Sequence, residues 1–216
     1  MEGRLSDYTL FLFDMDGTLV KFKLDFEYLK KVTRKILEEN RIQLEIKGSL
    51  IETLKELRSE FSEEEAYTEF VKKIENIVVQ HEIEASEKAE AFPHSIDLLT
   101  SLKSKGKNIG IVTRNNKAAS INTLKVTGLI DYMDVIVTRE DVEKLKPDPE
   151  HVEVAMKHLE KKAKDTVVIG DHRYDVLAGK RAGCFTIGVL SGVSSEDLLN
   201  DADLIVTSLE EIISFL

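Results

Sequence analysis

Six short apolar runs recur along the chain, and they restrict the folds that it can adopt. They are rich in Val, Ile, Leu and Phe, and most show no regular alternation of apolar and polar residues. They comprise residues 8–13, 108–113, 134–138, 166–170, 184–189 and 202–206. Continuous apolar runs of this length are typical of strands that are buried on both faces, as in a parallel sheet. The runs therefore predict a largely parallel β-sheet.

Amphipathic segments between the later runs predict helices. Examples are residues 95–106, 117–128 and 149–163. The first two end at glycine, which commonly follows the last turn of a helix. Strands that alternate with helices favour a doubly wound α/β fold, whose crossover connections are right-handed by default. We therefore predict helices packed on both faces of the sheet.

The alternation breaks between residues 19 and 87, where no run resembles the other strands. Three stretches of this segment instead carry apolar residues near the 3.6-residue period of a helix. They are residues 24–40, 49–61 and 62–85. We therefore predict a helical domain over residues 19–87, inserted into a core that consists of residues 1–18 and 88–216.

Two aspartates follow the first apolar run directly. Asp14 and Asp16 are separated by one residue, and side chains at alternate positions of a strand share a face, so both can reach the same volume. Gly17 then permits a sharp turn. Ligands of open α/β sheets bind at the carboxyl ends of the strands. Taken alone, the segment fits a surface turn as well as a functional site.

Other predicted strand ends also carry polar residues that suit chemistry. Thr113 ends one run, Lys146 follows another, and Asp171 and Asp175 follow a third. If the sheet is parallel, these residues and the first two aspartates meet at one edge. Four carboxylates in one crevice require a cation, and oxygen ligands favour a hard ion such as Mg²⁺. The hydroxyl of Thr113 and the ammonium of Lys146 suit phosphate oxygens.

Composition limits the partners of the chain. Thirty Lys and Arg against 40 Asp and Glu give a formal net charge of -10, which disfavours extended contact with nucleic acid or an anionic membrane. No segment approaches the roughly 20 apolar residues that span a bilayer, and the start lacks the pattern of a signal peptide. The single cysteine, Cys184, cannot form an internal disulfide. We therefore expect a cytoplasmic protein, with small anionic substrates still possible.

Taken together, these motifs resemble those of the haloacid dehalogenase superfamily of hydrolases over nearly the whole chain. Four motifs of the superfamily are matched in order. They are matched by Asp14 to Thr18, by Thr113, by Lys146, and by Gly170 with Asp171 and Asp175. The helical insert resembles the cap of the phosphoglycolate phosphatase and β-phosphoglucomutase branch. The resemblance implies an α/β fold with a Rossmann-like doubly wound parallel sheet core and an inserted helical cap domain.

The resemblance also implies catalytic roles. Asp14 would attack phosphorus and form an aspartyl phosphate, and Asp16 would act first as acid and then as base. Thr113 and Lys146 would bind the transferring phosphoryl group. Arg114 would add positive charge toward an anionic substrate, or it would point away and leave Asn115 to bind phosphate. These two alternatives stay open on the sequence alone.

The resemblance further implies a metal site and a class of substrate. Asp14, the main-chain carbonyl of Asp16 and Asp171 would hold Mg²⁺. Asp175 would be an outer or water-mediated ligand, or a partner of Lys146. The expected reaction is hydrolysis of a small phosphorylated metabolite.

Asp16 separates this chain from some branches of the superfamily, since dehalogenases lack an acid/base aspartate at this position and ion-pumping ATPases carry threonine there. Its presence favours hydrolysis of phosphate esters or phosphoryl transfer. A phosphomutase of the β-phosphoglucomutase type would use the same core residues. A catalytically silent protein that binds a phosphorylated ligand is a further alternative, although every catalytic position is filled.

Overall fold

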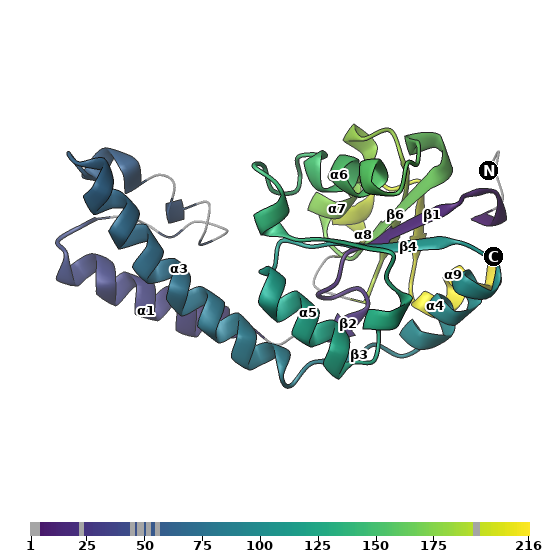
Figure 1. The fold of residues 1–216 in the computed structure, drawn as a ribbon, viewed down its shortest axis with the longest axis horizontal. Helices are drawn as coiled ribbons and strands as arrows, with labels where there is room; N and C mark the ends of the chain where they lie inside the picture. Colours follow the sequence, from purple (N-terminus) through teal and green to yellow (C-terminus); the bar gives the residue numbers. More distant parts are fainter. Residues whose placement is uncertain are drawn as a thin grey trace. The chain divides into compact units, whose positions relative to one another are not determined.

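The computed structural model describes residues 5–21, 24–43, 46, 50, 53–54, 57–191 and 195–216. Within these residues, six parallel strands form the central sheet (Figure 1). The strands are β1 (Leu10–Phe13), β4 (Asn108–Val112), β5 (Val135–Val137), β6 (Thr166–Gly170), β7 (Phe185–Val189) and β8 (Leu204–Val206). Their order is β5-β4-β1-β6-β7-β8, and each lies within one of the predicted runs. The prediction of a doubly wound parallel sheet is confirmed.

Helices cover both faces of the sheet (Figure 1). On one face lie α4 (Ser95–Ser104), α5 (Lys117–Val126) and α9 (Leu209–Ser214), and on the other lie α6 (Glu150–His158) and α7 (Arg173–Arg181). Phe11 and Phe13 of β1 pack into the first layer, whereas Leu10 and Leu12 pack into the second. All four side chains are fully buried. Burial on both faces explains why this run shows no polar alternation.

Several short elements complete the described secondary structure. Helix α8 (Glu196–Leu199) precedes β8. Single 3₁₀ turns lie at Leu5–Asp7, Leu57–Glu60, Ile130–Tyr132, Arg139–Asp141 and Ala163–Asp165. None of the helices that the structure describes combines the length and the apolar character needed to cross a bilayer.

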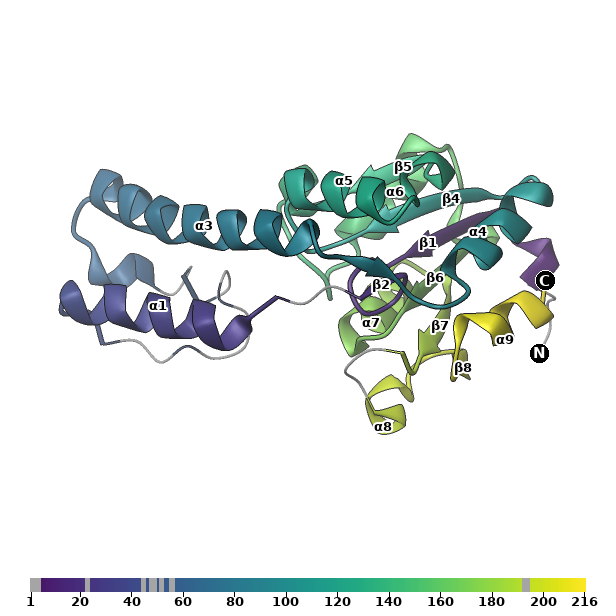
Figure 2. The same ribbon diagram turned by 90° about the horizontal axis from the view of Figure 1, so that it is seen from below.

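The chain divides into two compact units, residues 1–22 with 86–216, and residues 23–85. The smaller unit contains α1 (Phe26–Glu39) and nearly all of α3 (Glu64–Ser86), which run side by side (Figure 2). Its apolar core includes Leu37, Leu57 and Ile74, all nearly or fully buried. The smaller unit therefore has a hydrophobic core of its own. Of the helix predicted at residues 49–61, residues 49, 51–52 and 55–56 lie outside the described residues.

A two-stranded antiparallel ribbon lies where the chain leaves the core and where it returns. Strand β2 (Val20–Lys21) pairs with β3 (Glu90–Ala91). Close by, the Leu19 carbonyl accepts hydrogen bonds from the Phe92 backbone N–H and, at 2.8 Å, from the Ser95 hydroxyl. The two ends of the inserted segment are thus joined within the core. The sequence did not predict this ribbon because strands of two residues show no readable period.

Candidate active site

In the turn after β1, the side chains of Asp14, Met15 and Asp16 differ in their burial. Met15 is fully buried in the core, whereas Asp14 is 8% exposed and Asp16 is half-buried. The backbone N–H of Asp14 donates to the Ile169 carbonyl of β6 at 2.8 Å. The central strands therefore hold Asp14 at the carboxyl edge of the sheet, where the motif predicts a nucleophile.

Two glycines allow the backbone to approach the neighbouring carboxylates closely. Gly17 has φ +92°, and a Cβ atom at this position would lie 2.5 Å from Asp171 Oδ2. The next residue, Thr18, donates its hydroxyl to Asp171 Oδ1 at 3.0 Å. A Cβ atom at Gly170 would lie 2.3 Å from the Cβ of Asp175. The glycines of both motifs thus leave the space that these carboxylates occupy.

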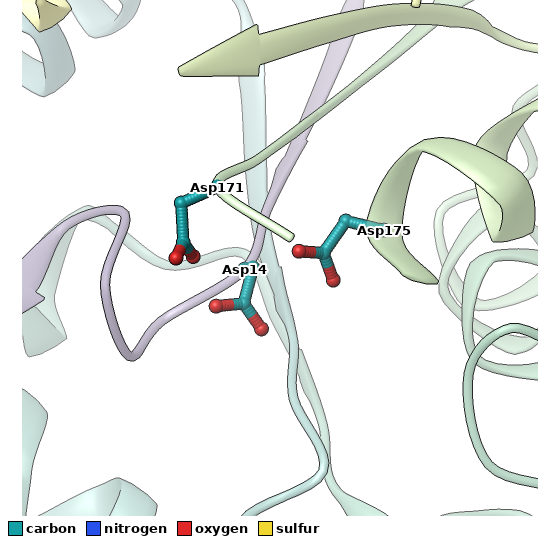
Figure 3. A group of neighbouring side chains, drawn as sticks. All are labelled: Asp14, Asp171 and Asp175. Carbon is teal, nitrogen blue, oxygen red and sulfur yellow. The ribbon is translucent and has the colours of Figure 1, made fainter. Parts of the chain in front are cut away.

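Three buried carboxylates converge at this edge (Figure 3). Asp14 follows β1, Asp171 follows β6, and Asp175 lies in the first turn of α7. Among the described residues, these three each offer an oxygen atom within 4.8 Å of the others. A buried set of oxygen donors fits a hard divalent cation such as Mg²⁺. The carboxylate of Asp16 is not part of this group. The metal ligand predicted at Asp16 is its main-chain carbonyl and not its side chain.

Lys146 provides the positive charge at the site. This residue lies in the loop before α6 and is 1% exposed. The ammonium donates to Asp14 Oδ1 and to Asp175 Oδ1, each at 2.6 Å, and to the Val112 carbonyl at 2.8 Å. Of the two roles proposed for Asp175, the structure shows the contact with Lys146. Every proton of the ammonium is therefore matched by an acceptor.

Burial and the neighbouring charges shift the pKa values of Lys146 and Asp14. Burial by itself would lower the pKa of Lys146, but the carboxylates of Asp14 and Asp175 outweigh it and hold the pKa above its ordinary value. Burial raises the pKa of Asp14 well above its usual range, and the charges of Asp175, Asp171 and Asp16 reinforce the shift against the opposing effect of Lys146. A single lysine therefore does not balance the carboxylates, and a bound cation would favour the ionised form of Asp14.

The turn after β4 brings a second polar network to Asp16. Thr113 is 1% exposed, and its hydroxyl accepts a hydrogen bond from the backbone N–H of Asn115 at 3.1 Å. The amide of Asn115 donates to Asp16 Oδ2 at 3.1 Å. Of the two residues considered for phosphate binding, Asn115 is thus placed against the expected acid/base residue.

Arg114 is directed toward α7. Its guanidinium lies 5.4 Å from the centre of the Tyr174 ring, a distance at which a cation interacts with an aromatic face. The Tyr174 ring in turn makes an edge contact with His172. This contact was not predictable from the sequence, because it depends on the side-chain orientations of two residues that are far apart along the chain.

His151 is a polar residue near the site to which the motifs assign no role. It lies in the first turn of α6 and is fully buried. Burial lowers its pKa to about 4, and the nearby charge of Lys146 adds to the shift. A neutral imidazole therefore lies close to the buried ammonium. The sequence feature that could have placed His151 near the site is its position five residues after Lys146, at the start of the following helix.

Several known proteins are similar to this chain in sequence or in structure. Pyrophosphatase PpaX of Bacillus pumilus is 30% identical over 200 residues, which cover 87% of this chain and 86% of that protein. Pyrophosphatase PpaX of Halalkalibacterium halodurans is 33% identical over 126 residues, which cover 57% of this chain but only 59% of that protein. The crystal structure of β-phosphoglucomutase from Clostridium difficile has a TM-score of 0.73 at 23% identity, and the match covers 95% and 93% of the two chains.

The family comparison is decisive because it covers most of the chain. The family model described as haloacid dehalogenase-like hydrolase matches residues 11–189, a range that includes all four motifs. The resemblance inferred from the motifs is thereby confirmed. The chain belongs to the haloacid dehalogenase-like hydrolase family.

Proposed function

We propose that the protein is a Mg²⁺-dependent phosphatase that hydrolyses a small phosphorylated molecule through an aspartyl-phosphate intermediate. The environment of Asp14 is the main support. This carboxylate is held at the end of β1, one of its oxygens lies 2.6 Å from the Lys146 ammonium, and two further carboxylates lie beside it. An aspartate fixed beside a cation is suited to attack a phosphoryl group.

The reaction would proceed in two displacements at phosphorus. An oxygen of Asp14 forms a bond to phosphorus while the bond to the leaving oxygen breaks, and the carboxyl proton of Asp16 passes to that oxygen. The Asp16 carboxylate then takes a proton from a water molecule that attacks the same phosphorus. Cleavage of the bond between Asp14 and phosphorus releases inorganic phosphate and restores both aspartates.

Other residues would hold the transferring group in position. Lys146 and the hydroxyl of Thr113 are the proposed donors to its oxygens, because both lie at the same sheet edge as Asp14. Donors fixed before the reaction stabilise the charge that develops in the transition state. Asp14, the main-chain carbonyl of Asp16 and Asp171 are the proposed ligands of Mg²⁺, which when bound supplies positive charge to the attacking and transferring oxygens.

The smaller unit is proposed to act as a cap domain. Its helices form a separate hydrophobic core between two connections to the catalytic unit. Lids of this kind exclude water and commit the substrate. Among the described basic residues in or beside this unit, Arg58 pairs with Glu64, and the ammonium of Lys21 lies over the Phe92 ring.

The relatives bear on which of two substrate classes the protein would hydrolyse. Two proteins similar to this chain carry the name pyrophosphatase, which favours a phosphoanhydride among the candidate substrates. A phosphomonoester of a small metabolite is the other class. Both classes would use Asp14 and Asp16 in the same roles, and they differ in the basicity of the oxygen that leaves.

A panel of phosphorylated compounds tests this proposal. Phosphate release is measured with and without Mg²⁺ for pyrophosphate, nucleotides, sugar phosphates, an aryl phosphate and a simple alkyl phosphate. The wild type is expected to release phosphate from at least one compound only when Mg²⁺ is present, and Asp14→Asn is expected to release none. Equal slow release by both proteins on every compound would contradict the proposal. Interconversion of sugar phosphates with little phosphate release would indicate a phosphomutase instead.

A further inference from the structure

Asn115 is 6% exposed, and each of its four polar groups makes a hydrogen bond. Its backbone N–H donates to the Thr113 hydroxyl at 3.1 Å, and its carbonyl accepts from the Arg139 N–H at 3.3 Å. In the side chain, Oδ1 accepts from the Asn116 N–H at 2.8 Å, and Nδ2 donates to Asp16 Oδ2 at 3.1 Å. The residue thus connects the turn after β4 to the turn after β1.

The backbone determines which end of the Asn115 amide faces Asp16. Because Oδ1 accepts from the Asn116 N–H, the NH₂ group points toward the carboxylate. A flipped amide would place an oxygen against a carboxylate oxygen and an NH₂ group against a backbone N–H, and both contacts would be repulsive. The hydrogen-bond network therefore fixes the amide as a donor to Asp16.

A rigid element supports this network. Asn116 is the N-cap of α5, and its side chain accepts from the Ala119 N–H at 2.8 Å. The Ser120 hydroxyl donates to the Asn116 carbonyl at 2.7 Å. The amide of Asn115 is therefore held by the first turn of a core helix rather than by a free loop. Side chains supported in this way hold a partner in one orientation.

We propose that Asn115 is a positioning residue for Asp16, and that it holds the acid/base carboxylate in the orientation needed for proton transfer. This inference rests on the proposed phosphatase function, and it assigns Asn115 a task other than binding the transferring phosphoryl group. Asp16 lies in the turn beyond Asp14 and is half-buried. A carboxylate that is already oriented avoids an entropy loss in the reaction step.

Asn115 as a positioning residue and Asn115 as a phosphoryl ligand predict different effects of the leaving group on the loss of kcat/KM in an Asn115 variant. A strongly basic leaving oxygen, such as that of an alkyl phosphate, needs a proton from Asp16 during the first displacement. A weakly basic one, such as that of an aryl phosphate, needs little help. A phosphoryl ligand, in contrast, contributes equally whichever group leaves. Since kcat/KM reports the steps up to formation of the phosphorylated enzyme, it is the appropriate quantity to compare.

The experiment compares wild type with Asn115→Leu, which keeps the approximate size and removes the donor. The two substrates are those of the panel that the wild type accepts and that differ most in the basicity of the leaving oxygen. We expect kcat/KM to fall about 10²-fold for the substrate with the more basic leaving group. For the other substrate we expect a fall of only about 10-fold. The inhibition constant of inorganic phosphate should stay within about twofold of the wild-type value, because the phosphoryl site is intact.

Two further variants keep the test decisive. Asn115→Asp has nearly the same shape as the wild-type residue but presents an oxygen to Asp16, so we expect it to show the same dependence on the leaving group. This variant replaces Asn115→Leu if the latter fails to fold. Asn122→Leu is the matched control, because its amide donates to Ser86 at 2.8 Å instead. This control should lower both kcat/KM values by the same small factor or leave them unchanged.

The outcomes separate this inference from the proposed function. Equal losses for both substrates with a parallel rise in the phosphate inhibition constant would make Asn115 a phosphoryl ligand and overturn the inference alone. Wild-type kinetics in both Asn115 variants would also overturn it alone. A wild type that releases phosphate from no compound would contradict the function itself, and the positioning role would fall with it.

Discussion

At the scale of single residues, Gly17 determines how closely the turn after β1 approaches Asp171. Alanine at this position would have to adopt φ +92° and would place its Cβ 2.5 Å from Asp171 Oδ2. A displacement of the site by about 1 Å can reduce the rate about 10²-fold. We therefore expect Gly17→Ala to lower kcat/KM for phosphate release by about that factor.

Gly106→Ala is the control for this substitution. It imposes the same kind of backbone strain at φ +69°, but a Cβ atom there meets nothing within 4 Å. It should lower the free energy of unfolding by roughly 1 kcal/mol and leave kcat/KM unchanged. If Gly17→Ala behaves like Gly106→Ala in both measurements, the close approach of the turn to Asp171 does not matter for activity.

His151 should link the stability of the protein to pH. Burial and the charge of Lys146 lower its pKa from 6.5 to about 4 in the folded chain. A lowered histidine pKa means that the unfolded chain takes up a proton first as the pH falls. Its contribution to stability is therefore complete above pH 6.5 and is lost as the pH falls toward 4. Between pH 7 and pH 5 this loss amounts to about 2 kcal/mol.

Urea denaturation at pH 7 and pH 5 measures this contribution. We expect the free energy of unfolding of His151→Leu to fall by about 2 kcal/mol less than that of the wild type over this interval. His158→Leu is the control, since His158 lies exposed on the same helix. An unchanged difference between the two pH values in His151→Leu would show that the buried imidazole is not the source.

At the scale of elements, the strands were predictable because their burial is visible in the sequence. The residues of β1 are buried on both faces, so the run lacks polar alternation. Strands β4, β6 and β7 are nearly as buried, whereas the edge strands β5 and β8 are partly exposed. The ribbon of β2 and β3 was not predictable, because each strand has two residues and depends on a partner about 70 positions away.

The positions of the site residues were predictable to a similar extent. A parallel sheet brings strand ends to one edge, and the structure brings Asp14, Lys146, Asp171 and Asp175 together there. The contact between Asn115 and Asp16 was not predictable, because it depends on side-chain orientation between residues 99 positions apart. Motif order therefore indicated which residues meet, whereas the backbone of each turn determines which atoms touch.

Helix α4 begins at a residue with an unfavourable backbone conformation. His94, its N-cap, has φ 65°, a left-handed value that costs about 1–2 kcal/mol for residues with a Cβ. Glycine removes this strain but loses about 0.5–1 kcal/mol through the greater freedom of the unfolded chain. The exposed contacts of His94 with Asp97 and Glu210 contribute little.

His94→Gly is therefore expected to raise the free energy of unfolding by about 0.5 kcal/mol, measured by urea denaturation. His94→Ala removes the same two contacts and keeps the strain, so it should be no more stable than the wild type. A glycine variant less stable than the alanine variant would show that α4 does not begin with a strained residue.

At the scale of the whole molecule, an acidic chain is proposed to act on an anionic substrate. The formal net charge is -10, and the candidate site adds a buried group of carboxylates. Lys146 is the positive charge buried among them. Activity is expected to depend on a divalent cation, because one ammonium is shared by several carboxylates and a phosphate group would add further negative charge.

Direct detection of phosphorylated Asp14 is the sharpest test of this account. The Asp16→Asn variant, which lacks the base for the second displacement, is mixed with Mg²⁺ and a substrate with a weakly basic leaving group. The reaction is quenched in acid, and the acyl phosphate is reduced with borohydride, which converts a phosphorylated aspartate to homoserine. We predict that peptide mass spectrometry finds homoserine at position 14 and that Asp14→Asn shows none. Turnover by the wild type with no modification at Asp14, or with modification at another residue, would contradict the account.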